Sequence, residues 1–449
     1  MGEGLVLSID SLDLEGRGVA RHEGKVIFVE GALPGEEVEA ERLRSKPRYE
    51  TARTLSVRRE SVMRVAPRCP HFGLHPGACG GCSMQHLEVR AQVALKQRAL
   101  EDTLWHLGRV RPGHLLRPIV GPSWHYRQRA RMTVRDVPAK GGVLVGFHER
   151  ARSFVADMTT CPVLPARIAG LLLPLRGLVG SLSMRRRLPQ IEIAICGPRA
   201  ETIVLVLRIL QPLSGDDLRR LQAFRREHDV SLWVQHGGPE SATPLDPGDM
   251  RRLTLSLPEF GVTIPFLPTD FTQVNHQVNE VLVRRVIRLL DPASRSHVLD
   301  FFCGLGNFTL PLATRAARVV GIEGNPGLVG RARQAAHDNE LSMVAEFESC
   351  NLFEWTSEDW RRMTLRLGGI DRVLIDPPRE GAQAIARSLV VAQDRPERLV
   401  YVSCNPATLA RDAAILVHEG GWKLESAGVV NMFPHTSHIE SIAVFRGTA

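Results

Sequence analysis

A short glycine-containing loop between a predicted strand and a predicted helix constrains the fold of this chain more than any other segment. The loop reads Asp300-Phe-Phe-Cys-Gly-Leu-Gly-Asn307, and the apolar run Val298–Phe302 leads into it. Gly304 and Gly306 allow backbone conformations with positive φ and a close approach to a ligand. A strand that ends in such a loop and continues into a helix is typical of nucleotide-binding α/β domains.

The segment that contains this loop, which we place at residues 271–449, alternates predicted strands with predicted helices. A helix at His276–Leu290 precedes the loop, and helices separate most of the later strands. Such alternation predicts a Rossmann-like α/β domain with a mostly parallel, doubly wound sheet. The later strands are expected at Ala317–Ile322, Asp371–Ile375, Arg398–Val402 and Ile439–Phe445.

Two further domains are expected before this one. Residues 1–62 contain short apolar runs separated by Gly, Asp and Pro turns, which predicts a small β-barrel of OB-like type. A small β domain that merely packs against its neighbour is the alternative. Residues 63–270 carry strands and helices in less regular order and predict a central α/β domain. A helix expected at residues 85–108 can pack either on that domain or on the C-terminal one.

Charge and composition limit the possible partners and location. The 449 residues include 57 Lys and Arg against 49 Asp and Glu, a formal net charge of +8. This excess favours a polyanion such as RNA, although arginine enrichment in a GC-rich genome would also produce it. No apolar run is long enough to span a membrane, and the N-terminus lacks the features of a secretory signal. We therefore expect a cytoplasmic protein with no membrane partner.

Acidic residues on both sides of the glycine loop indicate which ligand it holds. Asp300 precedes the glycines, and Glu323 ends the next strand, where a carboxylate can accept hydrogen bonds from ribose hydroxyls. A dinucleotide fingerprint would have a third glycine where this chain has Thr309. The pattern favours S-adenosylmethionine (SAM), with a domain that binds NAD as the alternative.

Cys404 lies just after the strand Arg398–Val402, at the sheet edge where ligands bind in such folds. A thiolate there can add to carbon 6 of a uracil ring and make carbon 5 nucleophilic enough to accept a methyl group. A base must then remove the proton from carbon 5, and Glu440 is a carboxylate in a mostly neutral stretch. Taken alone, Cys404 is as readily a packing residue, and Glu440 a surface carboxylate. Their combination is what favours catalysis.

The run Leu374-Ile-Asp-Pro-Pro-Arg-Glu-Gly381 places Asp376 at the end of another strand. Asp-Pro-Pro also occurs in methyltransferases that act on amino groups, usually before an aromatic residue, whereas this chain has Arg379 there. An amino-directed RNA methyltransferase, in which Cys404 is structural, is therefore an alternative. A non-catalytic RNA-binding protein that keeps the fold is a second one.

Three segments of the chain resemble the RNA uracil-5-methyltransferases that use SAM. They are Ser403–Asp412, Phe302–Thr309 and Pro434–Ser441, and the resemblance extends over nearly the whole sequence. It implies that Cys404 is the nucleophile and Glu440 the general base. It also implies that SAM is bound by Gln273, Phe302, Asn307, Glu323, Asn351 and Asp376.

Four cysteines outside the glycine loop suggest a metal site. Cys69, Cys79, Cys82 and Cys161 can hold either a [4Fe–4S] cluster or a structural zinc ion. Their pattern resembles the iron–sulfur site of the ribosomal members of the family, which the tRNA-directed member lacks. The nine residues between Cys69 and Cys79 are more than the resemblance predicts, and we expect the longer loop still to deliver Cys79.

The N-terminal β unit resembles the TRAM domain of the members that act on 23S rRNA. These resemblances imply a monomeric enzyme of rRNA processing that methylates carbon 5 of one uridine in 23S rRNA. The central domain, with its iron–sulfur cysteines, would bind the RNA. The target base must leave its stack to lie between Cys404 and the methyl group. A different 23S rRNA uridine or a tRNA uridine is the alternative within the family.

Overall fold

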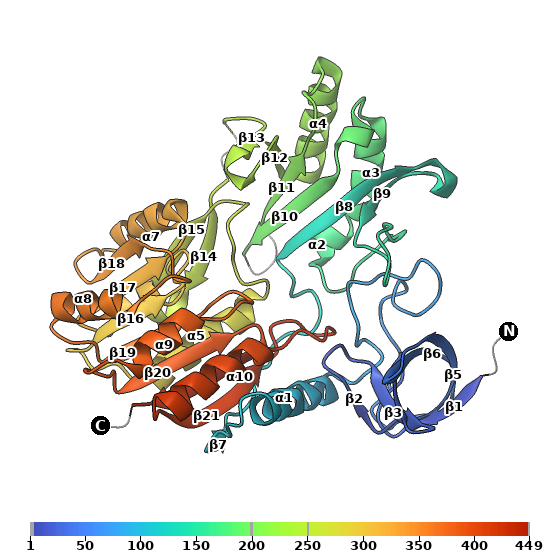
Figure 1. Cartoon of the computed structure of the whole chain (residues 1–449). Helices are drawn as coiled ribbons and strands as arrows, with labels where there is room; N and C mark the ends of the chain where they lie inside the picture. The colour runs from blue at the N-terminus through green and yellow to red at the C-terminus, as the bar shows by residue number, and fades with distance from the viewer. Residues whose placement is uncertain (1–3, 198–200, 249–250, 448–449) are drawn as a thin grey trace. The chain divides into compact units, whose positions relative to one another are not determined.

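The computed structural model describes residues 4–197, 201–248 and 251–447 (Figure 1). The chain divides into two compact units, each assembled from separate stretches of sequence. The first unit comprises Met1–Lys96, Ser123–Arg251 and Phe433–His438, and the second comprises Gln97–Pro122, Arg252–Met432 and Ile439–Ala449. Over the described ranges, no helix combines the length and the apolar character needed to cross a membrane.

The N-terminal part of the first unit is a rolled sheet of six strands in the order β1-β5-β6-β4-β3-β2 (Figure 1). Alternating residues such as Ile27 and Val29 of β4, and Val38 and Ala40 of β5, point into one apolar core. The predicted small β unit is therefore confirmed. Its strands are β1 (Leu5–Ser8), β2 (Ser11–Leu12), β3 (Gly18–His22), β4 (Lys25–Glu30), β5 (Glu37–Ser45) and β6 (Tyr49–Arg59).

A cysteine-bearing loop connects this sheet to helix α1 (Val89–His106). The helix begins later than predicted, because residues 84–88 form a turn in which the Leu87 amide bonds the Met84 carbonyl. Gln92, in the first turns of α1, is completely buried. This arrangement brings the end of the cysteine loop against the start of α1.

The remainder of the first unit contains a second six-stranded sheet, ordered β13-β12-β11-β10-β8-β9. Two short helices follow the sheet strand β9 in sequence, α2 (Ala166–Ala169) and α3 (Leu172–Ser181). Pro174 is tolerated because it lies in the first turn of α3. The other elements are β8 (Arg129–Val137), β9 (Gly142–Gly146), β10 (Gln190–Cys196), β11 (Thr202–Arg208), α4 (Gly215–His228), β12 (Ser231–Gln235) and β13 (Thr243–Pro244).

The second unit is built on an eight-stranded sheet in the order β18-β17-β16-β19-β20-β22-β21-β7. Strands β18 to β20 are parallel, as predicted, and β22 pairs antiparallel with both β20 and β21. The strands are β7 (His114–Leu115), β16 (His297–Phe301), β17 (Arg318–Glu323), β18 (Ala345–Ser349), β19 (Arg372–Ile375), β20 (Arg398–Ser403), β21 (Lys423–Val430) and β22 (Glu440–Arg446).

Helices connect the parallel strands of this sheet, which is the expected pattern of a doubly wound domain (Figure 1). They are α5 (His276–Leu290), α6 (Thr309–Ala313), α7 (Pro326–Asp338), α8 (Ser357–Leu367), α9 (Gln383–Val390) and α10 (Pro406–Ala414). A separate hairpin, β14 (Leu253–Leu257) with β15 (Val262–Phe266), begins this part of the unit. The parallel strands therefore direct their carboxyl ends to one edge, where the predicted site residues stand.

Candidate active site and cysteine cavity

The glycine loop after β16 has the strained backbone that its sequence predicts. Phe302, Gly304 and Gly306 have φ values of 63°, 55° and 87°, all in the left-handed region. A Cβ atom on Gly306 would lie 3.1 Å from atoms of Leu310 and of Phe347, whereas Gly304 faces open space. The loop therefore leaves room for a ligand beside Gly304.

Two carboxylates border this loop. Glu323, at the end of β17, accepts the Gly304 amide at 3.1 Å and the Asn325 amide at 3.0 Å. Asp300 is fully buried; its Oδ2 accepts the Thr309 hydroxyl at 2.6 Å, and among the described residues its Oδ1 has no partner. Burial, with the negative charge of Glu323, raises the pKa of Asp300 to about 7. An unpaired carboxylate oxygen beside an open loop fits a ligand that brings hydrogen-bond donors or positive charge.

Most of the other residues predicted to bind SAM lie just after neighbouring parallel strands. Phe302 and Asn307 follow β16, Asn351 follows β18 and Asp376 follows β19. Because these strands are parallel neighbours, the structure brings the four residues and Glu323 to one sheet edge.

Individual contacts hold several of these side chains in place. Asn307 exchanges two hydrogen bonds, of 2.8 and 3.0 Å, with the buried Asn279 of α5. The Phe302 ring lies 5.8 Å from the ring of Phe353, and the exposed Asn351 accepts the Phe353 amide at 3.2 Å. Gln273, by contrast, is half-buried in the loop before α5, away from the strand ends in sequence.

The register of two antiparallel strands brings Cys404 and Glu440 together. Ser403 of β20 pairs with Ser441 of β22, and the Ser441 hydroxyl donates to the Ser403 carbonyl at 3.3 Å. Cys404 directly follows β20, and Glu440 is the first residue of β22. The negative charge of Glu440 acts on the Cys404 thiol, so the two side chains lie near each other.

The electrostatic surroundings hold the Cys404 thiol in its protonated form. Burial raises the pKa of Cys404 to about 12, assisted by the negative charges of Glu440 and Asp376 and opposed by the Arg379 guanidinium. Burial likewise raises the pKa of Asp376 well above its usual range, with the charges of Glu440 and Asp300 adding to the effect. The acidic groups make this edge of the sheet a favourable place for a positively charged ligand.

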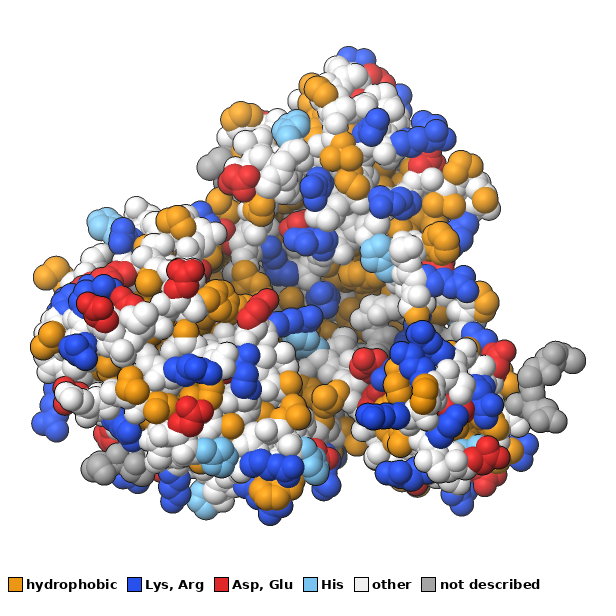
Figure 2. All heavy atoms as spheres, in the orientation of Figure 1, with side chains coloured by type: hydrophobic (Ala, Val, Ile, Leu, Met, Phe, Trp, Pro, Cys, Tyr) orange, Lys and Arg blue, Asp and Glu red, His pale blue; other side chains and the backbone are white. Residues whose placement is uncertain are grey.

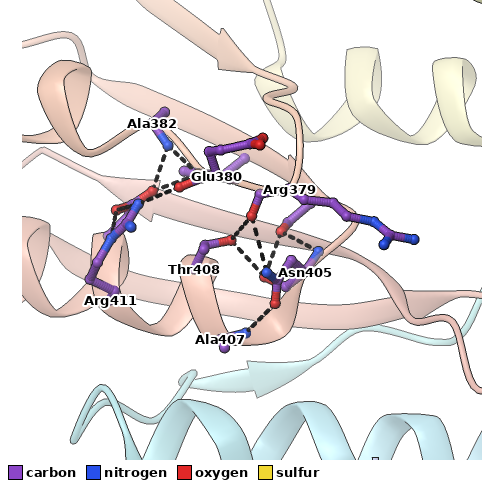
Figure 3. A network of polar contacts seen from close by, with 10 residues as sticks. Arg379, Glu380, Ala382, Asn405, Ala407, Thr408 and Arg411 are labelled. Carbon is purple, nitrogen blue, oxygen red and sulfur yellow. Dashed lines mark hydrogen bonds and ion pairs between the residues drawn. The ribbon is translucent and has the colours of Figure 1, made fainter. Parts of the chain in front are cut away.

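A polar network fastens the loop after Asp376 to the start of α10 (Figure 3). The Arg379 carbonyl accepts Asn405 Nδ2 at 3.0 Å and the Thr408 hydroxyl at 3.3 Å. Arg411 donates to the Glu380 carbonyl at 2.9 Å. In Figure 3 the Arg379 side chain projects away from this network, so its backbone is fixed while its guanidinium extends beyond.

The buried end of this network explains why position 381 is glycine. The Asp412 carboxylate accepts the Ala382 amide at 2.8 Å and the Tyr401 hydroxyl at 2.7 Å. Gly381 has a φ of 79°, and a Cβ atom there would lie 2.5 Å from Arg411. Sequence reasoning missed Tyr401 and Asp412 as supports of the site. An acidic residue within the largely apolar helix after Cys404 was the available signal.

The four predicted metal-binding cysteines line one cavity of about 90 Å³ in the first unit. Cys79 reaches it despite the long link, since its amide bonds the His71 carbonyl at 2.8 Å. Burial raises the pKa of all four thiols, to about 11 for Cys82 and about 12 for Cys161. Within the described part of the chain, no group of three or more His, Cys, Asp or Glu side chains is arranged to hold a metal ion. The four cysteines thus share one cavity.

Comparisons with known proteins agree with this architecture. Residues 254–446 match the family described as tRNA (Uracil-5-)-methyltransferase, and residues 2–55 match the TRAM domain. The chain is 57% identical over 442 residues to the 23S rRNA (uracil(1939)-C(5))-methyltransferase RlmD of Bordetella pertussis, which covers 98% of this chain and 92% of that protein. The protein of the same name from Cupriavidus pinatubonensis is 57% identical over 455 residues, which covers 99% and 96% of the two chains.

A solved structure has the same fold. The Pyrococcus abyssi tRNA (uracil-54, C5)-methyltransferase in complex with S-adenosyl-L-homocysteine matches with a TM-score of 0.72 at 22% identity, covering 98% of this chain and 100% of that one. Fold and matched regions together define an RNA uracil-5-methyltransferase. Within that class, the chain belongs to the RlmD family of 23S rRNA (uracil(1939)-C(5))-methyltransferases. The predicted TRAM unit and the predicted enzyme class are confirmed.

Proposed function

We propose that this protein methylates carbon 5 of one uridine in 23S rRNA through a covalent adduct with Cys404. The names of its relatives specify uracil 1939, and we propose the equivalent uridine as the target. The observation that carries the mechanism is the β20–β22 pairing, which brings the Cys404 thiol and the Glu440 carboxylate near each other at the ligand edge of the sheet. An amino-directed methyltransferase has no use for that pair.

The proposed reaction begins at the Cys404 sulfur. The thiol loses its proton to solvent, the sulfur bonds to carbon 6 of the uracil, and the electron pair of the C5–C6 double bond moves toward O4. Carbon 5 of this enolate would then bond to the methyl carbon of the donor, whose bond to the donor sulfur would break and leave its electron pair on that sulfur. Glu440 takes the proton from carbon 5, the C5–C6 double bond re-forms, and the bond from Cys404 to carbon 6 breaks to return the thiolate.

SAM, when bound, supplies an electrophilic methyl group on a positively charged sulfur. Of the residues here, Glu323 is placed to accept from ribose hydroxyls, and Asp300 offers a buried, unpaired carboxylate oxygen to a donor. We propose that the buried carboxyl of Asp376, at the same sheet edge, also contacts SAM. We propose Gln273, Phe302, Asn307 and Asn351 as the remaining contacts.

For the cysteine cavity we propose a [4Fe–4S] cluster held by Cys69, Cys79, Cys82 and Cys161. A zinc ion draws its four sulfurs to about 2.3 Å from one point, whereas a cluster binds each sulfur through a different iron and keeps the sulfurs farther apart. The four cysteines line one cavity, which supports a shared group. Aromatic and apolar walls such as Tyr126, Phe147 and Met158 would shield it from solvent.

RNA binding in this proposal uses contacts to the phosphate backbone from several parts of the chain. Lys and Arg side chains are spread across the face drawn in Figure 2, among acidic and hydrophobic side chains. The net charge of +8 and the TRAM match support a polyanionic partner. We propose that the TRAM unit and the central domain supply these contacts. The folded shape of the RNA, set by its own base pairing, would make the target uridine accessible.

A substrate that traps the adduct tests the proposal. Such a substrate is a 23S rRNA fragment with 5-fluorouridine at the target position. Fluorine cannot leave carbon 5 in the way that a proton does, so the adduct cannot break down. The protein should therefore remain crosslinked to this RNA when SAM is present. Cys404→Ala should abolish the crosslink. An adduct that forms without Cys404, or no adduct with the natural protein, would overturn the covalent mechanism and favour the amino-directed alternative.

A further inference from the structure

The hairpin loop that leads into Glu440 is held by the segment just after Cys82, by Tyr126 of the cavity wall and by helix α1. The loop is Phe433–His438, between β21 and β22, and it belongs to the first unit, although both strands belong to the second. The chain returns to the second unit at Ile439, one residue before Glu440. Only Ile439 separates this loop from Glu440 along the chain.

The segment just after Cys82 makes the first set of contacts. The amides of Ser83 and Met84 both donate to the His435 carbonyl, at 2.9 and 3.0 Å. The Ser83 hydroxyl accepts the Ser437 amide at 3.0 Å. The residues that follow a cavity cysteine in sequence thus bind the loop at two separate positions.

A residue of the cavity wall makes the second contact. Tyr126 lines the cavity, is buried, and donates its hydroxyl to the Pro434 carbonyl at 3.1 Å. Its neighbour Trp124 stacks on the His435 ring, with the ring centres 3.9 Å apart. A change in the shape of the cavity would move the hydroxyl that holds Pro434.

Helix α1 makes the third set of contacts. The Gln92 side chain accepts the His435 amide at 2.8 Å and faces His435 Nδ1 at 3.2 Å, while Lys96 donates to the Phe433 carbonyl at 2.9 Å. The same Gln92 amide also bonds the Met84 carbonyl at 3.0 Å, so it joins the cysteine segment to the loop.

The backbone of the loop is strained at its centre. His435 has a φ of 66°, in the left-handed region that side chains other than glycine rarely adopt, and it is 2% exposed. Such a conformation persists only where the surroundings hold the residue firmly. The contacts from Gln92, Ser83 and Trp124 supply that hold.

From these contacts we propose that the loop Phe433–His438 is a clamp through which the four-cysteine site positions Glu440 for proton abstraction. The inference rests on the proposed role of Glu440. Gln92, Ser83 and Tyr126 are then positioning residues, because they act on the reaction through the loop and not by touching the substrate. In this proposal the cysteine site affects proton removal from carbon 5, which follows the transfer of the methyl group.

The step that the clamp affects can be measured separately from the others. With ordinary uridine RNA and SAM, a misplaced Glu440 would leave the methylated adduct unable to lose its carbon 5 proton, so protein covalently bound to RNA would accumulate. Tyr126→Phe and Gln92→Leu should therefore slow adduct breakdown by about tenfold or more while changing adduct formation by about twofold or less. Gln334→Leu, at an exposed position of α7, is the matched control for Gln92→Leu and should leave both rates unchanged.

Two further measurements keep this test specific. In a Glu440→Gln background, Gln92→Leu should slow breakdown no further, because the base that it positions is already absent. Hydrogen exchange of the His435 and Ser437 amides should speed up in Gln92→Leu and after removal of the metal, with iron and sulfide content measured in each sample. Exchange in β10 and β11 should stay unchanged.

The outcomes separate this inference from the function on which it rests. If the natural protein forms no adduct with 5-fluorouridine RNA, the proposed mechanism itself fails. If it does form that adduct, but both variants break down the methylated adduct at the natural rate, the clamp is wrong and the mechanism stands. Unchanged exchange of the His435 amide in Gln92→Leu would likewise overturn the clamp.

Discussion

Cys404 and Glu440 lie near each other because β20 and β22 pair Ser403 with Ser441, the residues adjacent to them in the chain. The two residues are 36 positions apart in the sequence. An antiparallel strand next to the parallel part of the sheet brings them together. A thiol and a carboxylate are thus held near each other by the main-chain hydrogen bonds of the sheet.

Replacement of Glu440 by Gln should stop the reaction at the methylated adduct. Turnover should fall by about 10²–10⁴-fold, since a general base contributes about that much. Denaturing gel electrophoresis should show protein bound to ordinary uridine RNA in the presence of SAM. Glu419→Gln, at an exposed position, is the control and should turn over normally. Loss of turnover without any adduct would contradict the assigned role.

The reactivity of Cys404 should depend on the charges around it. Glu440 raises the pKa of Cys404 and Arg379 lowers it. At a fixed pH near 8, Glu440→Gln should therefore speed alkylation of Cys404 by iodoacetamide several-fold, and Arg379→Gln should slow it. Mass spectrometry of the Cys404 peptide separates this cysteine from the others. Equal rates in the three proteins would show that these charges do not reach the thiol.

The sequence predicted those features that depend on residues close together in the chain. The glycine loop, the segment around Cys404 and most parallel strands carry strong local patterns, and the structure places those strands within about two residues of their predicted bounds. Strand β18 (Ala345–Ser349) was missed because its sequence, Ala-Glu-Phe-Glu-Ser, is largely polar. Strand β21 was missed because Ser426 and Gly428 interrupt its apolar pattern.

Contacts between distant residues could not be predicted in this way. Gln92 and His435 are separated by 343 positions, and nothing in the pattern around either residue indicates the other. For the same reason the sequence did not reveal that residues 433–438 belong to the first unit. The proposed site residues could be named because motifs identify them one at a time. Their supports, such as Tyr401 and Asp412, depend on packing that motifs do not record.

The first unit should lose stability in acid through Asp217. Burial alone would raise the pKa of this carboxyl, but hydrogen bonds from Ser183 and Ser214 outweigh it and lower the pKa to about 2. Because the folded-state pKa is depressed, the contribution is complete above pH 4 and is lost as the pH falls toward 2. Asp217→Asn should cost about 1–3 kcal/mol of unfolding free energy at pH 7 and much less at pH 2.

The neighbouring Asp216 provides a matched control for that experiment. It is exposed and pairs with Arg219 and Arg220 on the surface of α4, so Asp216→Asn should change stability little at either pH. Denaturant unfolding followed by circular dichroism at both pH values measures the difference. Equal effects of the two substitutions at pH 7 would contradict the role of the Ser183 and Ser214 hydrogen bonds.

The cysteine cavity should stabilise the first unit only when its metal is bound. Cys161→Ser should remove iron and sulfide from the purified protein, abolish its brown colour, and lower the melting temperature of the first unit. Cys196→Ser, at a buried cysteine outside the cavity, should keep both iron and colour. A colourless natural protein loaded with zinc would show that the cavity holds a single ion.

The contribution of Asp300 to the stability of the folded protein should depend on pH in the opposite sense to that of Asp217. Its pKa is raised to about 7, so the folded protein holds a proton that the unfolded chain releases near pH 4. Stability without ligand is therefore greatest below pH 4 on this account and declines as the pH rises to about 7. Asp300→Asn should raise the melting temperature at pH 8, change it little at pH 4, and weaken binding of S-adenosyl-L-homocysteine. Calorimetry at the two pH values measures the change in stability, and a ligand titration measures the change in binding. If Asp300→Asn destabilises the protein equally at pH 4 and pH 8, Asp300 supports the fold by hydrogen bonding alone.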